Sequence, residues 1–467
     1  MQRLKKWSLR LVVVSATPII SFGSRFARNV ILSRLLVPEE FGTALALAVV
    51  VALGGLVTDV ALDRFVMIND SARALSTAHA LSILRAVLVA AVMVAAAPAL
   101  AALFGVDNAT QSFAIAAGLS AISGFAHLGI KQIQRSYDYL PQTIAQLAAN
   151  LVAIVALILA VFALHDHRAI IVSYAAELSV YVLASHLLAR TLYKVRWEGS
   201  VMREALSFGI PLTVNGLGLA VIYQLDRTLV GYWFGVKELA NYAVVLSVSV
   251  VPVNLILGVF SGIGMSYVLD GGEKVSELSK RYRLLVGIYS IVCTTYVLWL
   301  SITLDIVTPI IFGDSFTVDP SLQLLLIVIA LLRLQRGGAP TTFLLASSRT
   351  RLLALLNLSA GTGLFCAWVC LIVSPHIESM LVGIAIGEFI AFALSFTLTE
   401  KLIKPEEKVF DRFLTTLAAP MIITTLLAFF PVANWSNRGV ILGGGLLAIV
   451  FQLALERNKN ERFPFLM

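Results

Sequence analysis

Long apolar runs, each roughly twenty residues in length, alternate with short polar breaks along the whole chain. A run of about 20 apolar residues matches a helix that crosses the hydrocarbon core of a bilayer. Dividing the chain at its charged, glycine and proline breaks predicts about fourteen transmembrane helices and an all-α polytopic membrane protein. The approximate limits of these spans are 11–32, 41–64, 75–103, 110–130, 141–163, 169–189, 206–233, 240–268, 284–311, 321–343, 352–374, 378–399, 413–431 and 438–455.

The composition supports the membrane interpretation. Of the 467 residues, 59% are hydrophobic and only 13% are charged, about half the charged share of an ordinary soluble domain. A folded surface in water needs more polar cover than this. The composition therefore excludes a soluble enzyme, a nucleic-acid binder and a disordered regulator. The apolar runs are also too long for the ~10-residue alternating strands of an outer-membrane barrel.

The charges in the loops orient the helices. If the N-terminus is cytoplasmic, the inner segments hold 24 lysines and arginines and the outer segments hold 4. Cytoplasmic loops of membrane proteins carry such an excess, and a missing or extra helix would scramble the alternation. We therefore expect an even number of helices with both termini in the cytoplasm. The formal net charge of +8 belongs to these loops and does not indicate a nucleic-acid partner.

The sequence carries no sign of an enzyme, a cofactor or a metal site. The three cysteines, Cys293, Cys366 and Cys370, all lie inside apolar runs and indicate neither a disulfide framework nor a thiolate site. The phosphate-binding motif G-x-x-x-x-G-K-[ST] is absent, so we expect no ATP hydrolysis by this chain. No segment between the spans is long enough for a catalytic domain. We expect a non-enzymatic protein without cofactor or metal.

A short segment occurs twice in the sequence. Leu36–Gly42 (LVPEEFG) and Phe234–Ala240 (FGVKELA) each follow a long helix that has Ser-Phe-Gly near its start, and each precedes an apolar helix. The copies lie six predicted helices apart, and an even offset gives the two halves the same orientation. We expect two six-helix lobes in parallel repeat around a central cavity, an arrangement suited to alternating access.

The repeat divides the chain into three parts. Residues 1–204 form the predicted N-terminal lobe and residues 205–404 form the predicted C-terminal lobe. Residues 405–467 hold two additional transmembrane helices and a cytoplasmic tail.

Seven basic residues lie inside the predicted spans, and all seven are arginines: Arg25, Arg28, Arg64, Arg85, Arg227, Arg333 and Arg336. A charge in hydrocarbon is costly, so such residues usually face a wet cavity or a partner. Arginine binds phosphate and carboxylate through a fork of donors, whereas lysine acts as a point charge.

Two arginine pairs have helical spacing. Arg25 and Arg28 are three residues apart, so they share one face of the first helix, and Arg333 and Arg336 do the same on the tenth. The segment Gly337–Pro340 should break the tenth helix directly after the second pair. We predict that these four residues and Arg227 bind an anionic substrate. Ion pairing between helices and snorkelling to lipid headgroups remain open for each arginine.

Carboxylates inside the spans are candidates for ion coupling. Asp226, Glu177 and Glu388 stand in apolar surroundings, and desolvation there favours binding of a proton or another cation. Pairing with an arginine is the alternative for each. We expect transport to use an ion gradient or substrate exchange.

Several of these segments resemble one transporter family. Ser33–Gly42 (SRLLVPEEFG), after a helix with internal arginines, resembles the start of polysaccharide transporters, the Wzx-type flippases of the multidrug/oligosaccharidyl-lipid/polysaccharide (MOP) exporter superfamily. The stretch from Phe208–Pro211 (FGIP) through Gln224–Arg227 (QLDR) to Phe234–Leu239 (FGVKEL) resembles their seventh helix and its exit. The resemblance covers roughly residues 10–400. Val37 and Ala240 stand where the family often has glycine.

The resemblance implies a substrate and a location. It implies movement of a lipid-linked oligosaccharide, usually on undecaprenyl pyrophosphate, across the bacterial inner membrane for surface polysaccharide synthesis. Membrane lipids, a polysaccharide polymerase and glycosyltransferases are the implied partners. A pyrophosphate needs forked cationic donors, which agrees with the arginine pairs.

Two other functions are open. A cation-coupled multidrug exporter of the same superfamily should carry unpaired acids in its cavity, whereas here the excess inside the spans is basic. A non-transporting scaffold for polysaccharide assembly would not need intramembrane arginine pairs.

Overall fold

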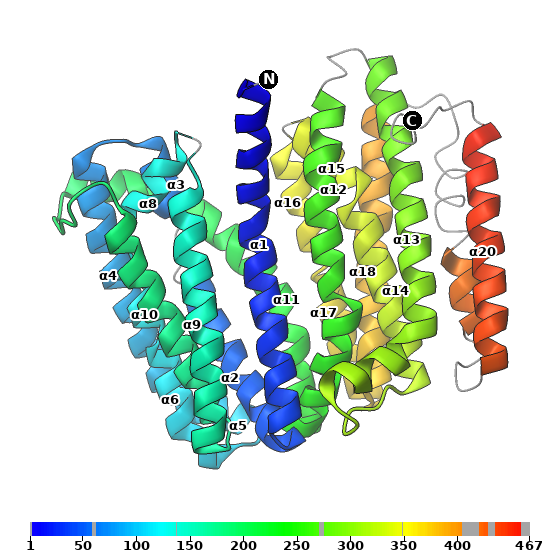
Figure 1. The fold of residues 1–467 in the computed structure, drawn as a ribbon, viewed down its shortest axis with the longest axis horizontal. Helices are drawn as coiled ribbons and strands as arrows, with labels where there is room; N and C mark the ends of the chain where they lie inside the picture. The colour runs from blue at the N-terminus through cyan, green and yellow to red at the C-terminus, as the bar shows by residue number, and fades with distance from the viewer. Residues whose placement is uncertain are drawn as a thin grey trace. The chain divides into compact units, whose positions relative to one another are not determined.

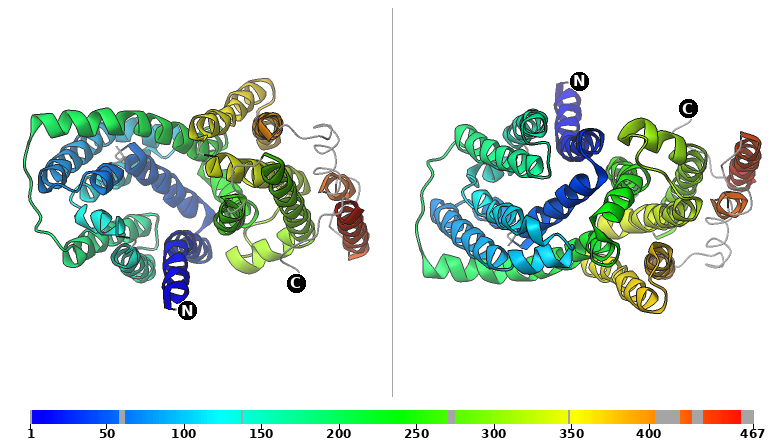
Figure 2. Two further views of the ribbon diagram at one scale, coloured as in Figure 1. Left: turned by 90° about the horizontal axis from the view of Figure 1, so that it is seen from above. Right: turned by 90° about the horizontal axis from the view of Figure 1, so that it is seen from below.

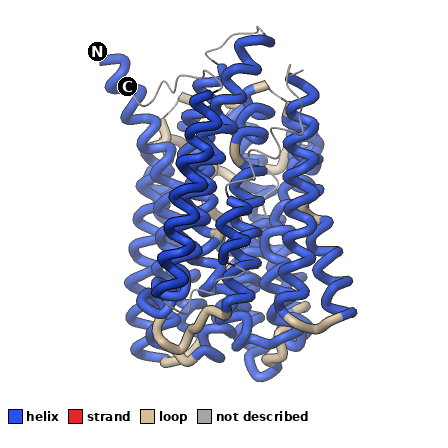
Figure 3. The backbone as a smooth tube through the Cα atoms, turned by 90° about the vertical axis from the view of Figure 1, so that its right-hand side faces the viewer, coloured by secondary structure: helices blue, strands red, loops and turns tan. Residues whose placement is uncertain are grey.

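All regular secondary structure in the described part of the chain is helical (Figure 3). A computed structural model describes residues 2–57, 62–136, 138–269, 275–347, 349–403, 420–427 and 435–458. Within these residues, nine helices are long and apolar enough to cross a membrane. The prediction of an all-α polytopic membrane protein is confirmed.

Two compact units divide the chain, Met1–Ala243 and Val244–Met467. The boundary between the units falls inside one long helix, Gly199–Ser249. The predicted lobe boundary between residues 204 and 205 is a different division of the chain, and it stays a prediction. The predicted boundary at residues 404 and 405 lies outside the described residues, as does most of the span 413–431; residues 420–427 are helical.

The first unit contains the helices of the first six predicted spans (Figure 1). These helices are α1 (Gln2–Leu35), α2 (Pro38–Val57), α3 (Leu62–Ile68), α4 (Ala72–Ala95), α5 (Ala97–Leu103), η1 (Asp107–Ala109), α6 (Thr110–Gly118), α7 (Ser120–Ser123), α8 (Gly129–Gln134), α9 (Leu140–Leu164) and α10 (Arg168–Leu188). Helices α9 and α10 pack against each other, and α1 packs against α9.

Helix α11 (Gly199–Ser249) contains a break at Gly235, whose φ of 82° and ψ of 176° are not helical. A positive φ is readily adopted only by glycine. The break separates the predicted spans 206–233 and 240–268, so the sequence located it correctly. The first half of α11 crosses the other helices of its unit at a steep angle (Figure 2).

The two copies of the repeated segment touch within the first unit. Pro38 begins α2, and a Cβ atom added to Gly42 would lie 1.8 Å from the carbonyl oxygen of Val236, directly after the α11 break. Glu39 and Lys237 form an ion pair beside this contact. Only a glycine at position 42 allows the backbones to approach so closely.

The second unit holds the remaining helices: α12 (Val251–Leu269), α13 (Val275–Phe312), α14 (Pro320–Gly337), α15 (Ala339–Ala346), α16 (Thr350–Ser359), α17 (Thr362–Val373), α18 (Ile377–Ile403) and α20 (Trp435–Asn458). The predicted break after Arg336 is confirmed, because α14 ends at Gly337 and α15 begins at Ala339.

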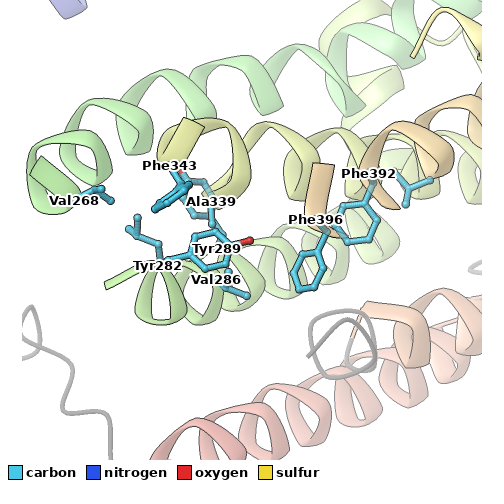
Figure 4. Packing of buried hydrophobic residues seen from close by; sticks show 10 residues of the cluster. Val268, Tyr282, Val286, Tyr289, Ala339, Phe343, Phe392 and Phe396 are labelled. Carbon is cyan, nitrogen blue, oxygen red and sulfur yellow. The ribbon is translucent and has the colours of Figure 1, made fainter. Parts of the chain in front are cut away.

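An aromatic cluster forms part of the core of the second unit (Figure 4). Tyr282 and Tyr289 of α13 lie with Phe343 of α15 and with Phe392 and Phe396 of α18, and all five are buried. The rings bury a large apolar area at low entropic cost. The cluster holds α13, α15 and α18 together.

Two contacts fasten other helices of this unit. A Cβ atom on Gly387 of α18 would lie 2.1 Å from the Cα atom of Gly363 of α17, so these helices pack with their backbones in contact. Arg438 of α20 binds both carboxylate oxygens of Asp305 of α13, with 3.2 Å between Nη1 and Oδ1. Helix α20 is thereby anchored to α13.

Candidate functional site

Arg28, which is buried, and Glu177, which is partly buried, form an ion pair in the first unit. Arg28 of α1 is 2% exposed, and its Nη1 donates a hydrogen bond of 2.6 Å to Oε2 of Glu177 on α10. The guanidinium also lies 4.8 Å from the centroid of the Tyr174 ring. Tyr174 stands three residues before Glu177, so both side chains reach Arg28 from the same face of α10.

The second terminal nitrogen of Arg28 is unused. Its Nη2 atom is buried and has no hydrogen-bond partner in the described part of the chain. A guanidinium offers five donors in a fixed fork, and a buried donor without a partner is costly. The pair therefore retains capacity for another acceptor, such as a second anion or a water molecule.

Arg25 lies in a different environment. It is exposed, although it stands only three residues before the buried Arg28 on α1. The two side chains therefore lie in different surroundings, and their joint role in binding a substrate stays a prediction. Arg25 is available to a ligand or a lipid headgroup, and Arg28 is engaged inside the protein.

The second arginine pair meets a carboxylate in the second unit. Nε of Arg333 donates to Oε1 of Glu388 at 2.7 Å, and Nε of Arg336 donates to Oε2 of the same carboxylate at 3.2 Å. Nη1 of Arg336 also donates to the side-chain oxygen of Asn357 at 2.9 Å. The side chains of Glu388 and Arg336 are 3% and 7% exposed. Helices α14, α16 and α18 thus share one charged network.

Ion pairs that are withdrawn from water lose favourable hydration energy. Two charges removed from water are compensated only if their geometry is good and their remaining polar atoms are bonded. In a membrane-spanning protein they face the interior or a wet cavity, and they mark pathways for substrates and ions. Arg28 thus contacts Glu177, and Arg333 and Arg336 contact Glu388; both carboxylates were themselves predicted to couple ions.

Asp226 differs from these carboxylates. It is 2% exposed and accepts hydrogen bonds from the Tyr242 hydroxyl at 2.9 Å and from the backbone N–H of Arg227 at 2.7 Å. Among the described residues, no basic side chain forms an ion pair with it. The Nε atom of Arg227 is buried and has no hydrogen-bond partner in the same part of the chain.

The bond between Asp226 and Tyr242 crosses the break in α11. Asp226 precedes Gly235 and Tyr242 follows it. The bond therefore helps to fix the orientation of the two halves of α11 relative to each other. A cation or proton on Asp226 would change this bond and act directly on the hinge.

The sequence analysis missed Tyr174, Asn357 and Tyr242. Tyr174 could have been found from its spacing of three residues before Glu177. Asn357 and Tyr242 carry no comparable signal in the sequence. Asn357 of α16 meets Arg336 of α14, and Tyr242 meets Asp226 from the other side of the break in α11. In the described residues, no cluster of three or more histidine, cysteine, aspartate or glutamate side chains could hold a metal ion.

Comparison with known proteins places this arrangement in context. The family model "Polysaccharide biosynthesis protein" matches residues 31–319, more than half of the chain. A search of curated protein sequences finds no match.

Solved transporter structures share the fold. The chain is similar to the inward closed conformation of the lipid II flippase MurJ, with a TM-score of 0.71, 11% identity, and 96% of this chain and 99% of that chain covered. It is also similar to the inward-facing conformation of a multidrug resistance MATE family transporter of the MOP superfamily, with a TM-score of 0.65 and 15% identity. There 85% of this chain and 98% of that chain are covered. At these identities the likeness shows the MOP fold.

Proposed function

Because the chain belongs to the family of polysaccharide biosynthesis proteins, we propose that it is a flippase for a lipid-linked oligosaccharide carried on undecaprenyl pyrophosphate. It moves this lipid across the bacterial inner membrane, with both termini in the cytoplasm, for surface polysaccharide synthesis. It works by alternating access, without enzymatic chemistry. A polysaccharide polymerase and glycosyltransferases act before and after it.

The observation that carries this proposal is a set of arginines in a MOP fold, of which Arg28 and Arg336 are buried and Arg333 is largely buried. Arg28, Arg333 and Arg336 lie inside helices that are apolar enough to span a membrane or that pack on such helices. Arginine forks bind phosphate with two donors, and this geometry suits a pyrophosphate. Ionisable residues inside membrane-spanning segments mark pathways for substrates and ions.

The carboxylates supply the coupling in this proposal. Glu177 and Glu388 contact the arginines directly, and Asp226 accepts a hydrogen bond from Tyr242 across the break in α11. A proton or Na⁺ that binds one of them alters the arginines or the hinge. The driving force is then an ion gradient, and ATP is not needed on this chain.

Reconstitution tests the proposal. The purified chain in proteoliposomes should render an undecaprenyl-pyrophosphate-linked monosaccharide accessible to an impermeant reagent from the opposite leaflet. The rate should rise when a proton or Na⁺ gradient is imposed. If the flipping rate is the same under every imposed gradient, ion coupling is ruled out. If no flipping occurs, this substrate is ruled out.

A second function is favoured by one observation. Asp226 is a buried carboxylate with no basic partner in the described residues, as a cation-coupled multidrug exporter requires. Efflux of ethidium from the same proteoliposomes under a proton gradient, lost in Asp226→Asn, would favour that alternative over the lipid flippase.

A further inference from the structure

Glu177 and Glu388 lie in two predicted spans that are six helices apart. Glu177 lies in the sixth predicted span, 169–189, and Glu388 lies in the twelfth, 378–399. Each follows a small residue, Ala176 or Gly387, and each is followed four residues later by an aromatic one, Tyr181 or Phe392. The offset of six helices is the same as that of the two copies of the repeated segment.

Each of the two carboxylates binds arginine from another helix of its own unit. Glu177 lies 2.6 Å from Nη1 of Arg28, and Glu388 lies 2.7 Å from Nε of Arg333 and 3.2 Å from Nε of Arg336. Both arrangements are largely withdrawn from solvent. Each unit therefore neutralises arginine charge with a carboxylate, and the two carboxylates come from predicted spans six helices apart.

A guanidinium binds carboxylate and phosphate with the same donors. An arginine that holds a carboxylate must therefore release it, wholly or in part, when a phosphate takes its place. Arg28 is suited to such an exchange, because its Nη2 atom is buried without a hydrogen-bond partner while Nη1 holds Glu177. An incoming phosphate can first engage the unused nitrogen.

We propose that Glu177 is a built-in competitor that occupies Arg28 until substrate phosphate displaces it. This inference rests on the proposed function and adds the device that couples substrate binding to ion uptake. On displacement, the carboxylate of Glu177 loses its cationic partner inside the protein. An unpaired buried carboxylate is costly, so it takes up a proton. Departure of the phosphate returns Arg28 to Glu177, and the proton leaves the carboxylate oxygen.

Among the described residues, Arg28 is the basic side chain that forms an ion pair with Glu177. Helices α6, α7 and α9, which pack with α10 or α1, carry no ionisable side chain. Glu40 of α2 binds His167, and Lys131 of α8 pairs with Asp63. On α1, Arg25 is exposed, and on α10 the hydroxyl of Tyr181 donates to Gln142. Arg28, with the Tyr174 ring against it, is the group that faces Glu177.

The test measures affinity and proton uptake together. The probe is an undecaprenyl-pyrophosphate-linked monosaccharide, whose pyrophosphate diester does not titrate near neutral pH, added to the purified full chain in detergent. Calorimetry in buffers of different ionisation enthalpy counts the protons bound with the lipid. The variants are Glu177→Gln and Arg28→Gln, with Asp305→Asn as the matched control, since it removes a carboxylate from an arginine outside the site.

Removal of the competitor should tighten binding. We expect Glu177→Gln to bind the probe about tenfold or more tightly, because a charge-assisted bond no longer has to be broken. Proton uptake should fall from about one per lipid to none. Arg28→Gln should bind at least about tenfold more weakly, and Asp305→Asn should match the wild type in both measurements. In the second unit, Glu388→Gln should also tighten binding.

The outcomes separate this inference from the proposed function. Unchanged or weaker binding by Glu177→Gln, with weaker binding by Arg28→Gln, would overturn the inference and show that Glu177 only positions Arg28. The flippase proposal would survive that result. If the wild type does not bind the probe, the proposed function itself fails. Should Glu177→Gln not fold, Glu177→Asp, which withdraws the carboxylate by one methylene, must also bind more tightly than the wild type.

Discussion

Glu39 and Lys237 occupy the same place in the two copies of the repeated segment and form an ion pair with each other. The distance between Oε1 and Nζ is 3.4 Å, and the two side chains are 56% and 63% exposed. An exposed pair of this kind contributes little to stability, because water screens both charges. The pair is therefore better suited to setting how the copies meet than to stabilising the fold.

Charge reversal tests this contact. Lys237→Glu and Glu39→Lys each place like charges together, so each should lower export of polysaccharide while changing the free energy of unfolding only slightly. The double variant restores the pair with its charges exchanged and should recover export. A double variant no better than either single change would show that the pair does not matter for transport.

Gly42 makes the close approach beside this pair possible. Its added Cβ would collide with the carbonyl oxygen of Val236, so Gly42→Ala should destabilise the protein by roughly 1–3 kcal/mol and reduce transport. Gly23→Ala is the matched control, because no atom lies within 4 Å of its added Cβ. That substitution on α1 should be neutral or slightly stabilising. Thermal unfolding of both variants in detergent measures the difference.

Arg25 and Arg28 should respond differently to substitution. Arg28→Ala leaves the partly buried carboxylate of Glu177 without its cationic partner, so the amount of folded protein in the membrane should fall. Arg25→Ala changes an exposed residue and should cost no more than about 0.5 kcal/mol.

Export distinguishes their roles further. If Arg25 contacts phosphate, Arg25→Ala loses export at a normal protein level, and Arg25→Lys keeps part of it because the charge remains without the fork. Full export by Arg25→Ala would show that Arg25 does not bind the substrate. Immunoblots of membranes together with polysaccharide assays provide both measurements.

The predicted orientation can be tested by cysteine labelling. Asn108, Asp314 and Pro375 are exposed in loops or turns assigned to the outside, so single cysteines there should react with an impermeant reagent in whole cells. Ser136 is exposed on the side assigned to the cytoplasm and should react only after permeabilisation. His167 is a poor position for this test, because it is held by Glu40 and Ser112. Labelling of Ser136 in intact cells would reverse the assignment.

Asp319 caps α14, which carries the second arginine pair. Its carboxylate accepts bonds from Oγ and the backbone N–H of Ser321, at 2.6 Å and 2.8 Å, and these bonds lower the pKa of Asp319 below its ordinary value. Asp319→Ala should cost about 1 kcal/mol at neutral pH.

The sign of the pH dependence follows from that direction. A lowered pKa in the folded protein gives stability that is present above the unfolded value of about 3.9 and is lost as the pH falls through the folded value. The difference in Tm between the wild type and Asp319→Ala should therefore shrink below about pH 4. Asp319→Asn should keep most of the cap at every pH, since its side chain also accepts a bond. A difference that is constant from pH 7 to about pH 3 would contradict this account.

Much of the helical architecture follows from sequence alone, because a bilayer imposes a length on every apolar segment. The breaks in α11 and after α14 also follow from sequence, since Gly235 permits a backbone that other residues avoid and Pro340 cannot continue the preceding helix. The sequence also showed that arginines and the carboxylates of Glu177 and Glu388 lie inside the predicted spans.

The tertiary structure alone decided which charges meet. Arg28 and Glu177 are separated by 149 residues, and Arg333 and Glu388 by 55, and no local spacing rule connects residues so far apart. It also decided that Arg28 is buried while Arg25 is exposed. Helices that are apolar on every side carry no periodic stripe to set their rotation, so packing against neighbouring helices determines which residues of each helix face inward.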